Sequence, residues 1–175
     1  MAVPVICAYA RTPFGKFRGA LSEYSAIELG ILAVTELLER AGIESDSGII
    51  DQVYMGQVLQ AGSGQAPARQ VALGSGLPYS TPCTTINKVC GSSLKAVMIG
   101  TTEIISGRAN VIIAGGMESM SNAPHFIHGA RRGDEISYGD LSSILRNDGL
   151  KDAYDGSMMG ITGENISEEA EISRE

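Results

Sequence analysis

The residue best suited to chemistry in this sequence is Cys90, within the stretch TTINKVCGSSLKAVMIG. The residues before it have the composition of a β-strand, and those after Gly91 have that of an apolar helix. A cysteine at a helix N-terminus meets unpaired backbone N–H groups and a partial positive charge, which favour the thiolate. The same N–H groups can hold an oxyanion. Two interpretations stay open at this point: a nucleophile, or a small core cysteine at a crowded turn.

Four other residues or motifs have a chemical interpretation, but each also has a structural one. His125 and His128 have the His-x2-His spacing of a metal site or could supply a base, yet no further ligand stands at a suitable distance, which favours loop histidines. Glu118 follows an apolar run, where a carboxylate is either a general base or a hydrogen-bonding anchor, and we favour the anchor. Gly62-x-Gly64 resembles half of a dinucleotide fingerprint but lacks its third glycine, which favours a turn.

The remaining cysteines are Cys7 and Cys83, both inside apolar runs, where we expect core positions. The odd number of cysteines and the absence of a CxxC pair argue against a disulfide scaffold or a structural zinc site, so we expect no bound metal. Reduced thiols predict a cytoplasmic location. A redox pair of Cys83 with Cys90 stays a weak alternative.

Strand-like and helix-like segments alternate through the first two thirds of the chain. Apolar runs predict strands over residues 3–11, 49–59, 83–90 and 109–116. Helical spacing predicts helices over residues 25–40, closed by Gly42, over 67–76, opened by Pro67, and over 92–107. The last of these helices is apolar on most of its circumference and is expected to be central and buried.

This alternation predicts an α/β fold, in the order βαβαβαβ, with a mainly parallel mixed sheet covered by helices. We place this domain at residues 1–120. Residues 121–175 are more polar and are expected to form part of a loop domain, with an amphipathic helix beginning near residue 164.

Composition excludes several classes of protein. The 175 residues are 43% hydrophobic and 19% charged, which is a globular composition. The formal net charge of −7 argues against a broad nucleic-acid surface, because such surfaces need clustered Lys and Arg. No stretch reaches the roughly 18 continuous apolar residues of a membrane span.

Five stretches, in chain order, resemble the N-terminal half of a thiolase. They read ARTPFGKFRGAL, GQVLQAGSGQAPARQVAL, NKVCGSSLKAV, GGMESMSNAP and MMGITGENISEEAEISRE. The third resembles the acyl-enzyme signature of the family and places Cys90 at the nucleophile position. Ser93 and Gly163 stand where many members have Gly and Ala. This resemblance covers nearly the whole chain and is more specific than any single motif.

The resemblance implies acyl transfer between two acyl-CoA molecules, either the Claisen condensation of two acetyl-CoA to acetoacetyl-CoA or the reverse thiolysis of a 3-ketoacyl-CoA. Cys90 would carry the acyl group, and its backbone N–H is a candidate oxyanion donor. Met159 and Gly160 match the block that lines the acyl and pantetheine channel. No cofactor is implied, since coenzyme A thioesters are the substrates.

The resemblance also implies what this chain does not contain. The family's catalytic His, its Asn motif and its second Cys belong to a C-terminal domain absent here, so the 175-residue chain alone is expected to have no turnover. A homodimer or homotetramer is implied for the full-length protein, with residues 84–89 near a dimer interface. Two alternatives remain: a ketosynthase-like condensing enzyme of the same superfamily, and a non-catalytic structural fragment.

Overall fold

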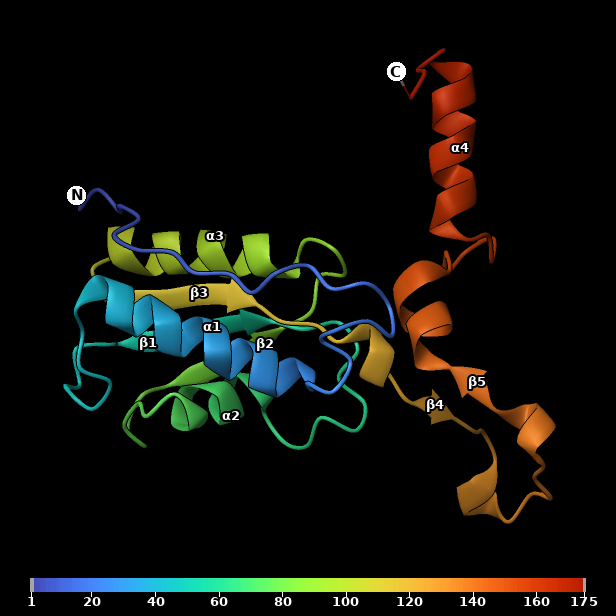
Figure 1. Cartoon of the computed structure of the whole chain (residues 1–175), viewed down its shortest axis with the longest axis horizontal. Coiled ribbons are helices and arrows are strands. Elements are labelled where there is room, and N and C mark those ends of the chain that lie inside the picture. The colour runs from blue at the N-terminus through green and yellow to red at the C-terminus, as the bar shows by residue number, and fades with distance from the viewer. Residues whose placement is uncertain (1, 175) are drawn as a thin grey trace. The chain divides into compact units, whose positions relative to one another are not determined.

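The computed structural model describes residues 2–174, and the chain divides into two compact units, Met1–Ala123 and Pro124–Glu175 (Figure 1). The first unit contains a three-stranded sheet and three α-helices. The second contains a two-stranded sheet, short helical turns and one α-helix.

The sheet of the first unit has the strand order β2-β1-β3, with β1 over Gln52–Gly56, β2 over Cys83–Ile86 and β3 over Ile112–Gly116. Both pairings are parallel, and the register brings the last residues of the three strands, Gly56, Ile86 and Gly116, side by side. Each parallel connection crosses through a helix, as parallel strands require. The loops that follow the three strands therefore meet at one edge of the sheet.

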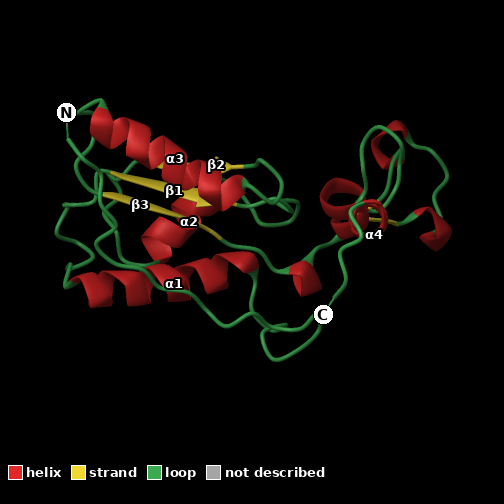
Figure 2. Ribbon diagram, turned by 90° about the horizontal axis from the view of Figure 1, so that it is seen from above, coloured by secondary structure: helices red, strands yellow, loops and turns green. Residues whose placement is uncertain are grey.

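Three helices cover the two faces of this sheet. α3 (Ser92–Ile105) lies on one face, while α1 (Ala26–Ala41) and α2 (Pro67–Gly74) lie on the other (Figure 2). Successive strand residues point to opposite faces, and Val53 and Met55 of β1 accordingly enter the core shared with α1 and α2. The buried residues of this core are Ala26, Val34, Leu38, Ile50, Val53, Met55, Ala68, Val71, Ala72, Leu77, Ile113 and Met117.

The helix ends of the first unit follow their sequence signals. The side chain of Ser25 accepts from the Glu28 N–H and the Glu28 carboxylate accepts from the Ser25 N–H, a capping box that starts α1. Gly42 ends the helix in the left-handed region, at φ 65°. Pro67 is the first residue of α2, where its missing N–H costs nothing. The predicted α/β architecture with a helix-covered parallel sheet is confirmed.

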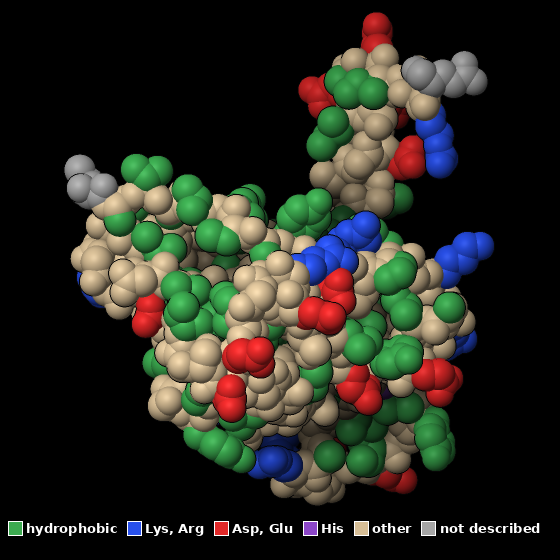
Figure 3. Space-filling model, turned by 60° about the vertical axis from the view of Figure 1, so that its left-hand side comes forward, with side chains coloured by type: hydrophobic (Ala, Val, Ile, Leu, Met, Phe, Trp, Pro, Cys, Tyr) green, Lys and Arg blue, Asp and Glu red, His purple; other side chains and the backbone are tan. Residues whose placement is uncertain are grey.

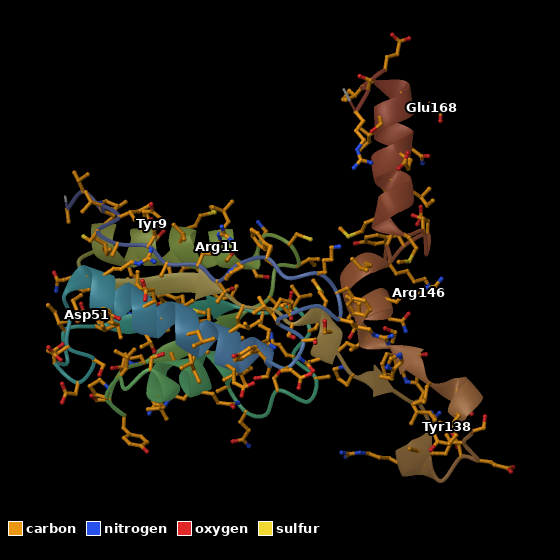
Figure 4. The ribbon with its side chains drawn as sticks, in the orientation of Figure 1. Tyr9, Arg11, Asp51, Tyr138, Arg146 and Glu168 are labelled. Carbon is orange, nitrogen blue, oxygen red and sulfur yellow. The ribbon has the colours of Figure 1, made fainter. Side chains whose placement is uncertain are left out.

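Two expectations about the first unit are wrong. Residues 3–11 form no strand. Val3 and Ile6 are 82% and 83% exposed, and the described hydrogen bond of the segment to α1 joins Arg40 Nη1 to the Tyr9 carbonyl at 3.1 Å (Figure 4). An apolar run predicts a strand only where a neighbouring strand completes its ladder. The outer face of α3 is also open to solvent, with Leu94 65% and Met98 51% exposed, because the sheet covers only one side of this helix.

The second unit has short elements. β4 (His125–Phe126) and β5 (Ser142–Ser143) pair antiparallel, and a π-helical turn runs over Leu145–Leu150. α4 (Met159–Glu169) begins earlier than the predicted helix, with Met158 as its N-cap. Among the described residues of this unit, Ile144 is the one buried side chain.

Candidate active site

Cys90 lies four residues beyond the end of β2, at the sheet edge where the three strands end. Its thiol is free and exposed to solvent. The next residue, Gly91, is the N-cap of α3, and within the described residues no side chain caps this helix N-terminus. The first N–H groups of a helix have no partner inside the helix. The predicted strand–turn–helix setting of Cys90 is therefore present, with the turn over residues 87–91.

The turn before Cys90 is held by side chains rather than by a sheet ladder. Val89 has a φ of 47°, in the left-handed region that β-branched residues rarely adopt. The Val89 N–H donates to Asn87 Oδ1 at 2.9 Å. The Lys88 N–H donates to Ser92 Oγ at 2.8 Å, and the same hydroxyl donates to the Val89 carbonyl at 2.6 Å. This bonding keeps the chain in a conformation that presents Cys90 beside the helix N-terminus.

Two glycines allow the first turn of α3 to lie directly on the sheet. A Cβ on Gly56 would stand 2.7 Å from both the Ser92 Cβ and the Ser93 nitrogen. A Cβ on Gly116 would stand 2.8 Å from the Ser93 Cβ. Real Cβ atoms do not approach other atoms so closely, so any larger residue would push the helix away. Cys90 can therefore occupy its position only because β1 and β3 end in glycines.

Glu118 joins the loops that follow β1 and β3. Its carboxylate accepts from the Val58 N–H at 2.8 Å and from the Leu59 N–H at 3.3 Å. Burial raises the pKa of Glu118, while these two hydrogen bonds act in the opposite direction. The Val58 carbonyl in turn accepts from Asn87 Nδ2 at 3.3 Å. Glu118 has the structural hydrogen-bonding role that we favoured, and the loops after all three strands form one connected frame.

Sequence reasoning missed Gln57, which directly follows β1 and is 1% exposed. Its amide nitrogen donates to Ser63 Oγ at 2.9 Å and to the Leu59 carbonyl at 3.3 Å. Within residues 2–174 its Oε1 is the buried side-chain polar atom left without a partner. A polar residue inside the apolar run VYMGQVL was the available signal.

The other cysteines stand apart from Cys90. Cys83 lies at the opposite end of β2, half-buried and free, with its thiol directed at the Thr81 carbonyl. Burial raises the pKa of the Cys83 thiol. Cys7 is exposed rather than buried in a core, because the strand expected around it does not form. All three thiols are free, and Cys83 and Cys90 are separated by the length of β2.

The remaining predicted residues belong to the second unit or to turns. His125 and His128 lie on and just after β4, and the His128 ring meets Phe126 edge-on at 4.9 Å between centroids. Met159 and Gly160 are the first two residues of α4. Gly62 and Gly64 both have positive φ, as the favoured turn requires. The described residues contain no group of three or more His, Cys, Asp or Glu able to hold a metal ion.

Two further features bear on possible partners, namely the charge of the surface and the length of the apolar helices. On the face drawn in Figure 3, Lys and Arg side chains stand among acidic ones and form no continuous patch. No helix among residues 2–174 is both long and apolar enough to cross a bilayer.

The fold and the site define a class of protein. It is an α/β domain in which a cysteine lies at the edge where the parallel strands end, just before the N-terminus of a helix that covers the sheet. The family model described as the thiolase N-terminal domain matches residues 4–175. The chain belongs to the thiolase family.

Individual relatives agree with this assignment. The chain is 48% identical over 171 residues to the acetyl-CoA acetyltransferase of Cupriavidus necator, a match that covers 98% of this chain and 43% of that protein. The corresponding enzyme of Pseudomonas aeruginosa gives the same identity and the same coverages. The crystal structure of the Acat5 thiolase of Ascaris suum in complex with coenzyme A superposes with a TM-score of 0.86 at 38% identity, covering 96% of this chain and 43% of that one. The chain thus spans less than half the length of the relatives it matches.

Proposed function

We propose that the full-length protein is an acyl-CoA C-acyltransferase of the thiolase type, in which Cys90 carries the acyl group as a thioester. The observation that carries this proposal is the exposed Cys90 thiol at the uncapped N-terminus of α3, in a chain that matches the thiolase N-terminal domain. The acetyl-CoA acetyltransferase relatives support acetyl-CoA as the substrate. The bound coenzyme A in the Ascaris suum structure supports coenzyme A thioesters in general.

The reaction needs a nucleophile, hydrogen-bond donors that stabilise the developing oxyanion, and a leaving group. The Cys90 thiolate attacks the thioester carbonyl carbon, the bond between that carbon and the sulfur of coenzyme A breaks, and free coenzyme A leaves with a proton. The carbonyl oxygen becomes an oxyanion during the attack, and the backbone N–H of Cys90 is a candidate donor to it. A base removes a proton from the methyl group of a second acetyl-CoA, and the resulting enolate carbon bonds to the acyl carbonyl carbon. The bond between that carbon and the Cys90 sulfur then breaks, which releases acetoacetyl-CoA and the Cys90 thiolate, and thiolysis is the reverse.

The rest of the proposal follows from the resemblance to thiolases. Met159 and Gly160, at the start of α4, would contact the acyl or pantetheine part of the substrate. No cofactor takes part. The second cysteine and the catalytic histidine would come from the remainder of the full-length protein, so the 175-residue chain alone has no turnover. We also propose a homodimer or homotetramer and, since the three cysteines are free, a cytoplasmic location.

Acyl trapping tests the proposal. The full-length protein is incubated with acetyl-CoA, quenched with acid and digested, and the acetyl group is located by mass spectrometry. We expect an added acetyl group on the peptide that contains Cys90, and none in the Cys90→Ala variant. Cys83→Ala is the matched control, because Cys83 lies at the other end of β2 and should leave the acetylation of Cys90 unchanged.

An acetyl group on another residue, or thiolysis of acetoacetyl-CoA by the Cys90→Ala variant at the wild-type rate, would overturn the assignment of Cys90. Turnover by the purified 175-residue chain would show that all the catalytic groups lie within it. That result would contradict the proposal that the second cysteine and the catalytic histidine come from the remainder of the full-length protein.

A further inference from the structure

The turn that presents Cys90 holds an unfavourable backbone conformation. Val89 is a β-branched residue at φ 47°, and such a residue is a genuine outlier in the left-handed region. Conformations of this kind persist only where the surrounding structure determines them. Since Val89 immediately precedes Cys90, whatever holds Val89 also sets the direction in which the Cys90 side chain leaves the backbone.

The Ser92 side chain is the group best placed to hold this turn. Ser92 is 5% exposed, although it belongs to the first turn of a helix whose neighbouring residues Ser93 and Leu94 are exposed. Its hydroxyl accepts from the Lys88 N–H and donates to the Val89 carbonyl, at 2.8 and 2.6 Å. One hydroxyl therefore bonds the peptide groups on both sides of the Lys88–Val89 segment.

The backbone around Ser92 strengthens this hold. The Ser92 N–H donates to the Val89 carbonyl at 3.1 Å, and the Gly91 N–H donates to the Lys88 carbonyl at 3.1 Å. The missing side chain of Gly56 leaves the space that the Ser92 Cβ occupies. The hydroxyl is thus fixed against the sheet on one side and bonded to the turn on the other.

We propose that Ser92 is a positioning residue for Cys90: its hydroxyl keeps Val89 in the left-handed conformation that directs the Cys90 thiol to the N-terminus of α3. Ser92 touches no substrate in this role and acts through the turn. The inference rests on the proposed function of Cys90 as the acyl carrier, and it adds the residue that sets the geometry of acyl transfer.

The test measures the rate at which Cys90 is acetylated, per folded molecule, by rapid quenching of the full-length protein with acetyl-CoA followed by mass spectrometry. Ser92→Ala removes both hydrogen bonds of the hydroxyl. We expect acetylation to slow by about 10- to 100-fold, the cost of misplacing a reacting group by about an ångström. Ser93→Ala, the same change at an exposed neighbour, should keep the wild-type rate.

A second variant separates positioning from general stability. Glycine adopts the left-handed conformation without steric cost, so Val89→Gly removes the need for a group that enforces it. If Ser92 acts through the turn, the double variant Ser92→Ala, Val89→Gly should be acetylated faster than Ser92→Ala alone. If Ser92→Ala does not fold, the double variant is the test. A double variant that folds and is acetylated at Cys90 supports the positioning role of Ser92.

Each remaining outcome counts against a named claim. Acetylation of Ser92→Ala at the wild-type rate overturns the positioning role while leaving Cys90 as the acyl carrier. A double variant that is unfolded, or no faster than Ser92→Ala, overturns it too, since Ser92 would then serve packing alone. Absence of acetylation at Cys90 in the wild-type protein overturns the proposed function instead.

Discussion

Met55 and Met159 are both methionines in regular secondary structure, one in each unit of the chain. Met55 lies in β1 and is 2% exposed, while Met159 opens α4 and is 44% exposed. The difference extends to the whole of each unit, because the first has a continuous core and the second has one buried side chain, Ile144, among its described residues. A unit with a core can hold a cysteine in a demanding geometry. A unit without one presents its apolar side chains to whatever packs against it.

The largest expected effect comes from separating the two units. Residues 1–123 expressed alone should unfold in one cooperative thermal transition, because they contain the sheet and its helices. Residues 124–175 alone should show no such transition, because short helices such as the 11-residue α4 are marginal in water without packing. Circular dichroism and calorimetry measure both, and a sharp transition in the 124–175 fragment would remove the contrast.

The same substitution in each unit gives the next largest effect. Met55→Ala should lower the free energy of unfolding by about 2–5 kcal/mol, since it leaves a cavity between β1 and the helices. Met159→Ala should change it by less than about 0.5 kcal/mol, since the side chain is half exposed. Urea denaturation of the whole chain measures both, and equal effects would show that Met159 is packed as tightly as Met55.

A pair of Gly→Ala changes should differ in sign. Gly56→Ala places a Cβ against Ser92 and Ser93 and should destabilise the first unit by about 1–3 kcal/mol through overpacking. Gly163→Ala meets nothing within 4 Å in α4 and should favour that helix by up to about 1 kcal/mol. Melting temperature reports the first and helical circular dichroism the second. A stabilising Gly56→Ala would contradict the close approach of α3 to the sheet.

The smallest effect is electrostatic and depends on pH. Asp51 accepts from the Asn110 and Val111 N–H groups, which lowers its pKa below the ordinary 3.8, and Asp155 has its pKa lowered by the Ser157 N–H. A lowered pKa means that the folded state binds fewer protons. Stability from Asp51 is therefore present above pH 3.8 and is lost as the pH falls through the lower folded pKa.

Asp51→Asn removes the titrating carboxylate, so the free energy of unfolding should fall less on acidification than in the wild-type chain. The difference should be less than about 1 kcal/mol, because water screens a carboxylate near the surface. Asp155→Asn is the matched control and should leave the unfolding of the first unit unchanged, because its bond closes only a local turn. Unfolding curves at pH 3 to 6 measure both, and an equal response of the two variants would contradict a stabilising role for the bonds from the Asn110 and Val111 N–H groups to Asp51.

The sequence predicted the parts of the first unit that depend on local signals. Ser25, Gly42 and Pro67 mark helix ends by their own backbone chemistry, and the structure places those ends accordingly. The setting of Cys90 between a strand and a helix followed from composition alone, and its position in a thiolase motif followed from the resemblance.

The parts that could not be predicted depend on partners distant in sequence. Residues 3–11 have the pattern of a strand, but a strand also needs a neighbour, and none pairs with this segment among the described residues. The apolar residues around α3 predict a helix that is buried on all sides, but Leu94 and Met98 on its outer face are exposed. The bonds of Ser92 and Asn87 to the turn could not be foreseen, because a hydroxyl or an amide in a sequence does not indicate which backbone group it will meet.

The peptide group between Val58 and Leu59 has a mechanical consequence. Its N–H, that of Leu59, donates to the Glu118 carboxylate at 3.3 Å, and its carbonyl, that of Val58, accepts from Asn87 Nδ2 at 3.3 Å. One peptide group therefore links the loop after β3 to the turn before Cys90. Peptide groups are planar and stiff, so displacement on one side is passed on instead of being absorbed by side-chain rotation. A displacement of Glu118 would therefore shift the carbonyl that Asn87 binds, and with it the turn that precedes Cys90.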